Sequence, residues 1–484
     1  AEDRTGEDPI VIGGGPCSYN PEPIAPFFDL FYLGEGEVVY FDLLDRYKEN
    51  KRNGGSRKDF LEMAAEIPGI YVPSFYDVWY KEDGTIDRMV PVNPHAPDKV
   101  SKQLVMDMDA TYYPEKPVVP FIKVTQDRVV LEIMRGCIRG CRFCQAGFIY
   151  RPVREKSPEV IDAQSRALCA STGYEEFSLS SLSTSDYSRL EELLPRLLDW
   201  AEKEHTNISL PSLRVDGFSE ELANQLNVLR RSGLTFAPEA GTQRLRDAIN
   251  KNVTEEEILE TSRKAFAGGW TAVKLYFMMG LPTETLEDIE GIARLGQQIV
   301  NLYYANPDKP KGKGVTVSIS ASCFVPKPFT PFQWEPQDTM EELRAKQKHL
   351  VASVTTKKIS LSWHEAETSF LEAVFARGDR RLCAVIEEAY RRGCHLDSWS
   401  EHFDFATWMQ VFADLGVEPA FYANRRRSYE EILPWDHLDY GVTKAFLKKE
   451  SEKARQSVTT PNCRQACSGC GAACWKGGVC VENR

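Results

Sequence analysis

The chain has 484 residues, of which 42% are hydrophobic and 27% charged, and its net charge is −12. This length predicts about three domains with ample cores, and this composition excludes a disordered or collagen-like protein. No apolar run reaches the ~18 residues of a membrane-spanning helix and no secretory signal pattern opens the chain, so we expect a cytoplasmic protein without a membrane partner. The acidic balance disfavours extensive wrapping of nucleic acid, although residues 421–484 carry an excess of four positive charges.

Residues 1–60 begin with a charged loop, followed by an apolar strand that ends in Gly13, Gly14 and Gly15. A buried parallel strand needs neighbours on both sides, so the sequence predicts the C-terminal remnant of an α/β domain that begins further upstream. Glycines after such a strand let the backbone approach a nucleotide, whereas the same residues alone would also suit a generic turn. Residues 61–125 are predicted to be a connecting segment.

Residues 126–350 alternate between apolar strand-like runs and amphipathic helical stretches, the pattern of parallel β/α units. Six units favour an α/β fold with a partial (β/α)6 barrel over a closed eightfold barrel. The predicted strands span residues 129–134, 176–181, 207–211, 234–237, 272–279 and 315–320. In such barrels the chemistry gathers in loops at the carboxyl ends of the strands.

Three cysteines, Cys137, Cys141 and Cys144, follow the first predicted strand with C-x3-C-x2-C spacing. Thiolates are the usual ligands of iron–sulfur clusters, and three of them leave one of four irons open to a substrate. Arg139 and Arg142 are expected to place positive charge near such an anionic cluster. The alternative is a structural zinc site, but zinc sites usually pair two C-x2-C halves and no second half lies nearby.

With aromatic Phe143 directly before the last cysteine, this loop resembles that of the radical S-adenosylmethionine (SAM) superfamily. The resemblance implies a [4Fe-4S] cluster on the three cysteines and SAM chelated by the open iron. It also implies reductive cleavage of SAM to methionine and a 5'-deoxyadenosyl radical, with Phe143 on the adenine side. By position in later loops, it implies further cofactor contacts at Ser181, Ser183, Ser212, Arg214, Glu239, Gly241 and Gly280.

The N-terminal glycines, together with Gly34-Glu-Gly-Glu37, are similar to the end of the cobalamin-binding domain of B12-dependent radical SAM enzymes. With the segments 324–334, 362–365 and 434–437, the chain resembles an uncharacterised B12-binding radical SAM family. That resemblance makes residues 1–60 the end of a Rossmann-like cobalamin-binding domain and Gly13, Gly14 and Gly15 cofactor contacts. Whether the chain itself binds cobalamin is left open.

Residues 351–450 are predicted to be helical and contain His364, His402 and His437 beside tryptophans or acidic residues. Each histidine could be a general acid, a cobalt ligand or a substrate anchor, or a hydrogen-bonded core residue. His364 is the preferred catalytic candidate because it follows the barrel directly and has Glu365 beside it.

The tail, residues 451–484, carries five closely spaced cysteines, and the first three repeat the spacing of the barrel loop. Such a set can complete an auxiliary iron–sulfur cluster or a four-thiolate zinc site, and the shared spacing favours the cluster. Cys474 and Cys480 compete for the fourth ligand position. The five candidates are Cys463, Cys467, Cys470, Cys474 and Cys480.

The sequence therefore predicts a radical SAM enzyme, with cobalamin-linked methylation or a related modification of an unknown substrate. The alternatives are a methylthiotransferase-like modification of RNA or protein without cobalamin, and a non-catalytic iron–sulfur or zinc protein that binds RNA. A reducing partner such as flavodoxin or ferredoxin is expected, and the substrate could be RNA, protein or a small molecule.

Overall fold

The computed structural model describes residues 1, 3–211, 234–307, 309–310, 312–475 and 477–482. The chain forms two compact units, each assembled from several segments. Unit 1 comprises residues 1–105, 325–340 and 365–444, and unit 2 comprises residues 106–324, 341–364 and 445–484. In the part of the chain that the structure describes, no helix is long and apolar enough to cross a membrane.

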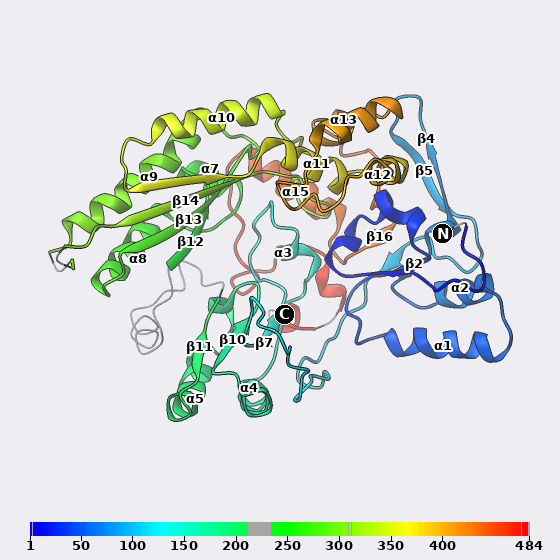
Figure 1. Cartoon of the computed structure of the whole chain (residues 1–484), viewed down its shortest axis with the longest axis horizontal. Helices are drawn as coiled ribbons and strands as arrows, with labels where there is room; N and C mark the ends of the chain where they lie inside the picture. The colour runs from blue at the N-terminus through cyan, green and yellow to red at the C-terminus, as the bar shows by residue number, and fades with distance from the viewer. Residues whose placement is uncertain (2, 212–233, 308, 311, 476, 483–484) are drawn as a thin grey trace. The chain divides into compact units, whose positions relative to one another are not determined.

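Unit 2 contains two parallel sheets whose strands alternate with helices (Figure 1). One sheet has the order β11-β10-β7 and the other the order β12-β13-β14-β15. Their strands are β7 Val129–Glu132, β10 Glu176–Ser180, β11 Asn207–Ser209, β12 Leu234–Glu239, β13 Ala272–Met279, β14 Thr316–Cys323 and β15 Ile359–Trp363. The helices that follow in unit 2 are α4 Pro158–Thr172, α5 Leu190–Lys203, α7 Gln243–Ala248, α8 Glu255–Ala267, α9 Leu286–Ala305, α10 Met340–Ser353 and α15 Lys444–Arg455.

In the sheet β12-β13-β14-β15, apolar and polar side chains alternate along the strands, and the apolar ones mark the buried face. Along β14, Val317, Ile319 and Ala321 are buried, and the serines between them are only partly covered. The buried residues pack with those of β13, α8 and α9 in one large core. Two capping boxes, Thr254 with Glu257 and Thr285 with Asp288, start α8 and α9 at defined points, because each satisfies backbone N–H groups that the first helical turn leaves open.

The predicted α/β fold with parallel β/α units is confirmed, with one correction. Residues Ile359–Trp363, which we expected to be helical, form the strand β15, paired in parallel with β14. Their sequence Ile-Ser-Leu-Ser-Trp alternates apolar and polar residues, which suits a strand with one covered face. The strand brings His364 to the carboxyl edge of the sheet.

Unit 1 combines small sheets with helices. The strands β1 and β2 pair in parallel, and β3 joins β2 in the antiparallel direction. The helices α11–α14 share an apolar core in this unit. The elements are β1 Ile12–Gly13, β2 Leu30–Tyr32, α1 Tyr40–Arg52, α2 Arg57–Ala65, β3 Ile70–Tyr71, β4 Tyr76–Tyr80, β5 Ile86–Pro91, β6 Val100–Ser101, α11 Ala366–Ala376, α12 Leu382–Arg391, α13 Phe405–Asp414, α14 Pro419–Ala423 and β16 Leu438–Asp439.

Candidate functional site

The three-cysteine loop begins after β8 (Met134–Arg135) and ends at the short helix α3 (Ala146–Ile149). Its first residue, Gly136, has a φ of +86°, a conformation that glycine adopts without cost. A Cβ atom there would lie 2.7 Å from the Tyr150 carbonyl oxygen and 3.1 Å from that of Pro152. The loop can therefore leave the strand in this direction only with glycine at position 136.

The three sulfurs lie near one another and are largely shielded from solvent. Burial, helped by the nearby Cys141 and Cys144 sulfurs, raises the pKa of the Cys137 thiol to about 12. Burial and Cys141 raise the pKa of the Cys144 thiol to about 11. The Arg139 backbone N–H donates to Cys137 Sγ at 3.4 Å. Because such thiols lose their protons when they bind a metal, the loop can offer three thiolates to one site.

Among the described residues, no three His, Cys, Asp or Glu side chains surround one point as the ligands of a single metal ion would. In a four-iron cluster, by contrast, each thiolate binds a different iron. Three cluster ligands therefore need not converge as the ligands of zinc do. The donor set of this loop fits a cluster with one iron that lacks a protein ligand.

Arg139 joins this loop to the loop that follows β10. Its guanidinium donates to the Asp186 carboxylate at 2.9 and 2.5 Å, and Ser183 Oγ donates to the same carboxylate at 2.7 Å. Ser181 Oγ lies 3.0 Å from Thr184 Oγ1. Ser183 thus lies beside the cysteine loop and helps to hold Asp186 in place, whereas the hydrogen bond of Ser181 stays within its own loop.

The expectation that Arg142 places positive charge at the cluster is wrong. The side chain is fully buried, and its guanidinium donates to the Glu450 carboxylate at 3.0 and 3.2 Å. It also donates to the carbonyl oxygens of Ala248 and Val458 at 2.9 and 2.7 Å. Its charge is neutralised by Glu450, so Arg142 anchors the loop to the helix α15.

A further charged pair lies near the cysteines, formed by the last residue of β12 and a residue that follows α7. Glu239 has a φ of +67°, which is rare for a residue with a side chain and marks a constrained position. Its carboxylate accepts a hydrogen bond from Lys251 Nζ at 3.2 Å, and both charges are electrostatic neighbours of the Cys144 sulfur. Lys251 was not recognised from the sequence, since a lone lysine after a helix gives no signal.

The other rim glycines have structural explanations of their own. A Cβ at Gly241 would lie 2.1 Å from the Asp288 carbonyl oxygen, so this glycine lets the loop pack on α9. Gly280 has a φ of +84°, and its N–H donates to the Glu284 carboxylate at 2.7 Å. Phe143 is half-buried on the cysteine loop. Ser212 and Arg214 lie outside the described residues.

The N-terminal glycines lie in unit 1 and differ from one another. A Cβ at Gly13 would lie 2.3 Å from the Phe31 ring, so packing alone accounts for this glycine. Gly15 has a φ of +78° with open space around it, and Gly14 is not crowded. Only Gly14 and Gly15 therefore have room for a ligand beside them.

The three candidate histidines have different surroundings. His364 is exposed at the carboxyl end of β15, where its N–H donates to the Ala321 carbonyl oxygen at 3.2 Å. His402 is exposed on unit 1. His437 is buried beside the Tyr71 and Tyr76 rings, with its Nε2 3.7 Å from Glu22, and burial lowers its pKa to about 4. His437 is thus a neutral core residue, and His364 alone lies at the carboxyl end of a barrel strand.

The tail packs on the cysteine loop within unit 2, as the red C-terminal segment beside α3 in Figure 1 shows. The Cys463 N–H donates to the Ile138 carbonyl oxygen at 3.0 Å. Asn250 bridges the two segments: its amide nitrogen donates to the Gly140 carbonyl oxygen at 3.0 Å, and its amide oxygen accepts from the Thr460 N–H at 2.7 Å. The role of Asn250 could not be predicted from the sequence, because its partners are 110 and 210 positions away.

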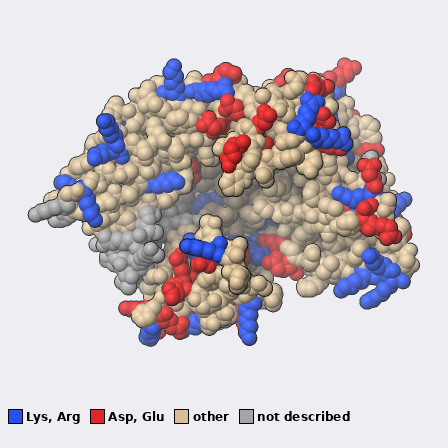
Figure 2. Space-filling model, viewed as in Figure 1, with Lys and Arg blue, Asp and Glu red and all other residues tan. Residues whose placement is uncertain are grey.

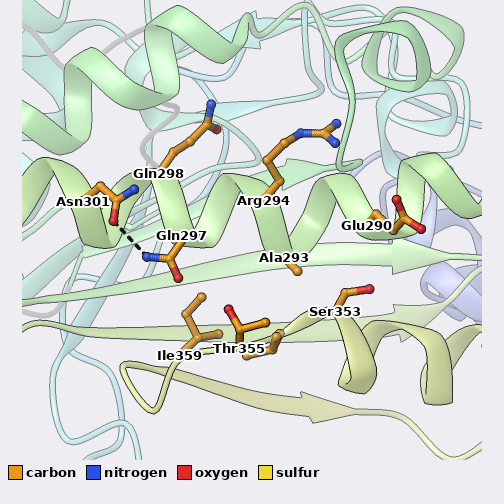
Figure 3. A pocket seen from close by; sticks show the side chains of 10 residues that line it. Glu290, Ala293, Arg294, Gln297, Gln298, Asn301, Ser353, Thr355 and Ile359 are labelled. Carbon is orange, nitrogen blue, oxygen red and sulfur yellow. Dashed lines mark hydrogen bonds between the residues drawn. The ribbon is translucent and has the colours of Figure 1, made fainter.

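A cavity of about 510 Å³ lies elsewhere on unit 2, between α9 and the segment that leads into β15 (Figure 3). Its polar lining includes Glu290, Arg294 and Gln297, and Gln297 donates to Asn301 at 2.9 Å. Ile359, the first residue of β15, also lines it. Because the cavity lies at the amino end of this strand, it is separate from the carboxyl-end loops that carry the cysteines.

The amino-acid sequence matches two family models. The model described as "Radical SAM superfamily" matches residues 131–296, which include the three-cysteine loop, and "Radical SAM proteins, N-terminal" matches residues 1–73. Uncharacterized protein MJ0966 of Methanocaldococcus jannaschii is 30% identical over 381 residues, 78% of this chain and 73% of that protein. The chain belongs to the radical SAM superfamily.

Other relatives of this radical SAM protein are more distant. Uncharacterized methyltransferase PH0819 of Pyrococcus horikoshii is 25% identical over 60% of this chain and 58% of its own length. A tRNA-2-methylthio-N(6)-dimethylallyladenosine synthase of Geobacillus kaustophilus is 25% identical over 41% of this chain and 39% of its own length. The chain thus spans less than two thirds of each of these two proteins.

One solved structure with similarity is TsrM, a radical SAM methyltransferase from Kitasatospora setae with cobalamin and a [4Fe-4S] cluster bound. The sequence identity is 15% and the TM-score 0.43, and the match covers 64% of this chain and 56% of TsrM. The cofactors of TsrM are properties of that protein.

Proposed function

We propose that this radical SAM protein holds a [4Fe-4S] cluster through Cys137, Cys141 and Cys144 and cleaves SAM reductively. The observation that carries the proposal is the gathering of these three shielded sulfurs at the end of the first strand. When bound, the cluster supplies the electron that cleaves the sulfonium of SAM. A reduced flavodoxin or ferredoxin is the proposed electron donor.

The chain's own residues position this chemistry. Gly136 sets the direction of the loop, and the Arg139–Asp186 pair and the Arg142–Glu450 pair fix it from two sides. The Glu239–Lys251 pair near Cys144 offers one carboxylate and one ammonium group. These are the charges that the ammonium and carboxylate groups of SAM would need, so we propose that this pair orients the methionine part of SAM.

We further propose that the outcome is methyl transfer to an unknown substrate. The support is the name of the relative PH0819, an uncharacterized methyltransferase. The methylthiolation named for the Geobacillus relative is the second candidate. On the face in Figure 2, basic and acidic side chains are interspersed. In the tail, Arg464 is ion-paired with Glu155. The proposal of a macromolecular substrate such as RNA or protein therefore has no support from a charged patch on that face.

Cobalamin dependence fits the residues only in part. Gly14 and Gly15 leave space beside them, but the Phe31 ring fills the space at Gly13. Cobalamin dependence therefore stays a prediction. The tail cysteines are proposed to bind an auxiliary iron–sulfur cluster, with zinc as the alternative.

Product analysis tests these proposals. The reconstituted protein is reduced under anaerobic conditions with SAM, with and without cobalamin, and 5'-deoxyadenosine and S-adenosylhomocysteine are quantified. Cobalamin is the methyl acceptor supplied in this mixture, so cobalamin-linked methyl transfer predicts S-adenosylhomocysteine where reduced cobalamin is present, in addition to 5'-deoxyadenosine. Formation of 5'-deoxyadenosine without any S-adenosylhomocysteine in the presence of reduced cobalamin would contradict methyl transfer from SAM through cobalamin.

A further inference from the structure

The first and last cysteines of the tail are held on the same small patch of the barrel. Cys463 is anchored by its own N–H, which donates to the Ile138 carbonyl oxygen at 3.0 Å. Val479, directly before Cys480, donates to the Val153 carbonyl oxygen at 3.1 Å. Ile138, Val153 and Val479 form one buried apolar cluster, and Cys463 packs against it. Two backbone hydrogen bonds therefore bring the two ends of the cysteine run together.

Glycines make the second anchor possible. A Cβ at Gly478 would lie 2.0 Å from the Val153 carbonyl oxygen, and one at Gly477 would lie 1.9 Å from the Met106 methyl carbon. Gly478 also has a φ of +58°. The chain before Cys480 can therefore approach the barrel this closely only without a side chain at position 478, where the backbone of Val153 is the neighbour, whereas the flexible end of Met106 could move at position 477.

Electrostatic contacts link four of the five tail sulfurs. The sulfurs of Cys470, Cys463 and Cys467 are electrostatic neighbours of the Cys480 sulfur, and Cys470 and Cys467 are electrostatic neighbours of the Cys463 sulfur. Cys470 is buried, with 8% of its surface exposed. Cys467 is exposed, as is Cys474 on the short 3-10 helix Ala472–Trp475. The choice of Cys467 over Cys474 rests on its place beside the Cys463 and Cys480 sulfurs. Four neighbouring thiols are the number that a complete cubane cluster takes.

A buried arginine lies between the two cysteine groups. Arg151 is 3% exposed, and its guanidinium donates to the carbonyl oxygens of Gly147 and Arg139 at 2.9 and 3.0 Å, both on or next to the barrel loop. The same guanidinium is an electrostatic neighbour of Cys463, Cys470 and Cys137. A buried anion needs a compensating charge, and Arg151 supplies one to both sites.

We propose that Cys463, Cys467, Cys470 and Cys480 bind a [4Fe-4S] cluster packed against the barrel loop, with Arg151 as a counter-charge shared by the two cluster sites. This inference rests on the auxiliary cluster of the proposed function and adds its ligands, its position and its electrostatic link to the SAM site. Cys474 is outside the ligand set. Arg151 is a positioning residue, since it acts on the clusters through their sulfur ligands.

The ligand set is tested in the full chain with the barrel site removed. In the variant C137A/C141A/C144A, anaerobic reconstitution should leave about four irons and four sulfides per chain with an EPR-active reduced cluster. Adding C480S should abolish most of this iron, whereas adding the matched C474S should not. Loss of iron with C474S but not with C480S would overturn the ligand set. Absence of iron from the triple variant, or one zinc in its place, would overturn the cluster itself.

The role of Arg151 is tested by the midpoint potential of the same tail cluster. Removing a positive charge disfavours the more negative reduced state, so R151Q should lower the potential, and R151K should restore most of it. An unchanged potential in R151Q at full iron content would contradict the shared counter-charge. These measurements need no SAM, so the two proposals can fail separately. If the tail binds a cluster but the protein never cleaves SAM, the proposed function is refuted and the tail cluster stands.

Discussion

Arg142, which lies between two cysteines of the barrel loop, forms a buried ion pair with Glu450, 308 positions further along the chain. The side chain of Arg142 is 0% exposed and that of Glu450 3%. The pair connects the candidate cluster site to α15, the helix directly before the cysteine-rich tail. The loop's position thus depends on a segment outside the sequence matched by the radical SAM superfamily model, which ends at residue 296.

Replacing Glu450 by Gln should destabilise the protein by about 3–5 kcal/mol, because it leaves the Arg142 charge buried without its partner. The exposed Glu452 on the same helix provides the matched control, and E452Q should change the free energy of unfolding by less than about 0.5 kcal/mol. Denaturant unfolding monitored by circular dichroism measures both. Equal effects of the two substitutions would show that the buried pair is not what stabilises this segment.

The pH dependence of this pair has a definite sign. Burial acts to raise the pKa of Glu450, but the hydrogen bond from Lys453, the Arg142 charge and Thr460 lower it overall. A carboxyl whose pKa is lowered by folding stabilises the protein above its unfolded pKa of about 4.3. This stabilisation should disappear as the pH falls through the lower folded pKa, and E450Q should lack that component.

Gly136→Ala should prevent the barrel loop from forming its cluster site. The substitution places a Cβ against two carbonyl oxygens and forces alanine into a left-handed conformation, at a cost of about 1–3 kcal/mol for the conformation alone. Gly173 is the control, since it has a similar φ of +72° but nothing within 4 Å of its Cβ. Iron bound to the barrel site should fall severalfold in G136A and stay unchanged in G173A, as measured with the tail cysteines replaced.

His437 should make the stability of unit 1 depend on pH. Burial lowers its pKa from 6.5 to about 4, so between these values the unfolded chain takes up a proton that the folded chain does not. Stability should be complete above pH ~6.5 and fall by about 3 kcal/mol as the pH decreases to ~4. His437→Phe should remove this slope, whereas His402→Phe, at an exposed position, should retain it. A slope that persists in H437F would assign the effect to other groups.

The alternation of apolar runs and helical stretches in the sequence predicted most strands of the barrel. Each predicted strand of the β/α alternation has a counterpart in the structure, since apolar runs bounded by helices are a local signal. The strand β15 was missed because residues 351–450 were interpreted from their prevailing helical pattern, although these five residues alternate as those of a strand do. The assembly of unit 1 from segments before and after the barrel could not be predicted, because no local pattern encodes such distant contacts.

The candidate site was predictable only at its cysteines. Their spacing is local, so Cys137, Cys141 and Cys144 could be named directly, whereas Asn250, Lys251 and Arg151 gain their roles from contacts with distant loops. Gly241, expected to contact SAM, is explained by close packing against the α9 backbone. Arg142 was misassigned because sequence proximity to the cysteines does not reveal the direction of its side chain.

The most direct test of the account is SAM cleavage by the reconstituted, reduced protein. We expect 5'-deoxyadenosine and methionine in equal amounts from the wild-type chain. The single variants C137A, C141A and C144A should reduce 5'-deoxyadenosine to the level of the reaction without protein, whereas C394A, which alters a buried cysteine of unit 1, should not. A wild-type protein with a full complement of iron that forms no 5'-deoxyadenosine, or formation that persists without the three cysteines, would contradict the account.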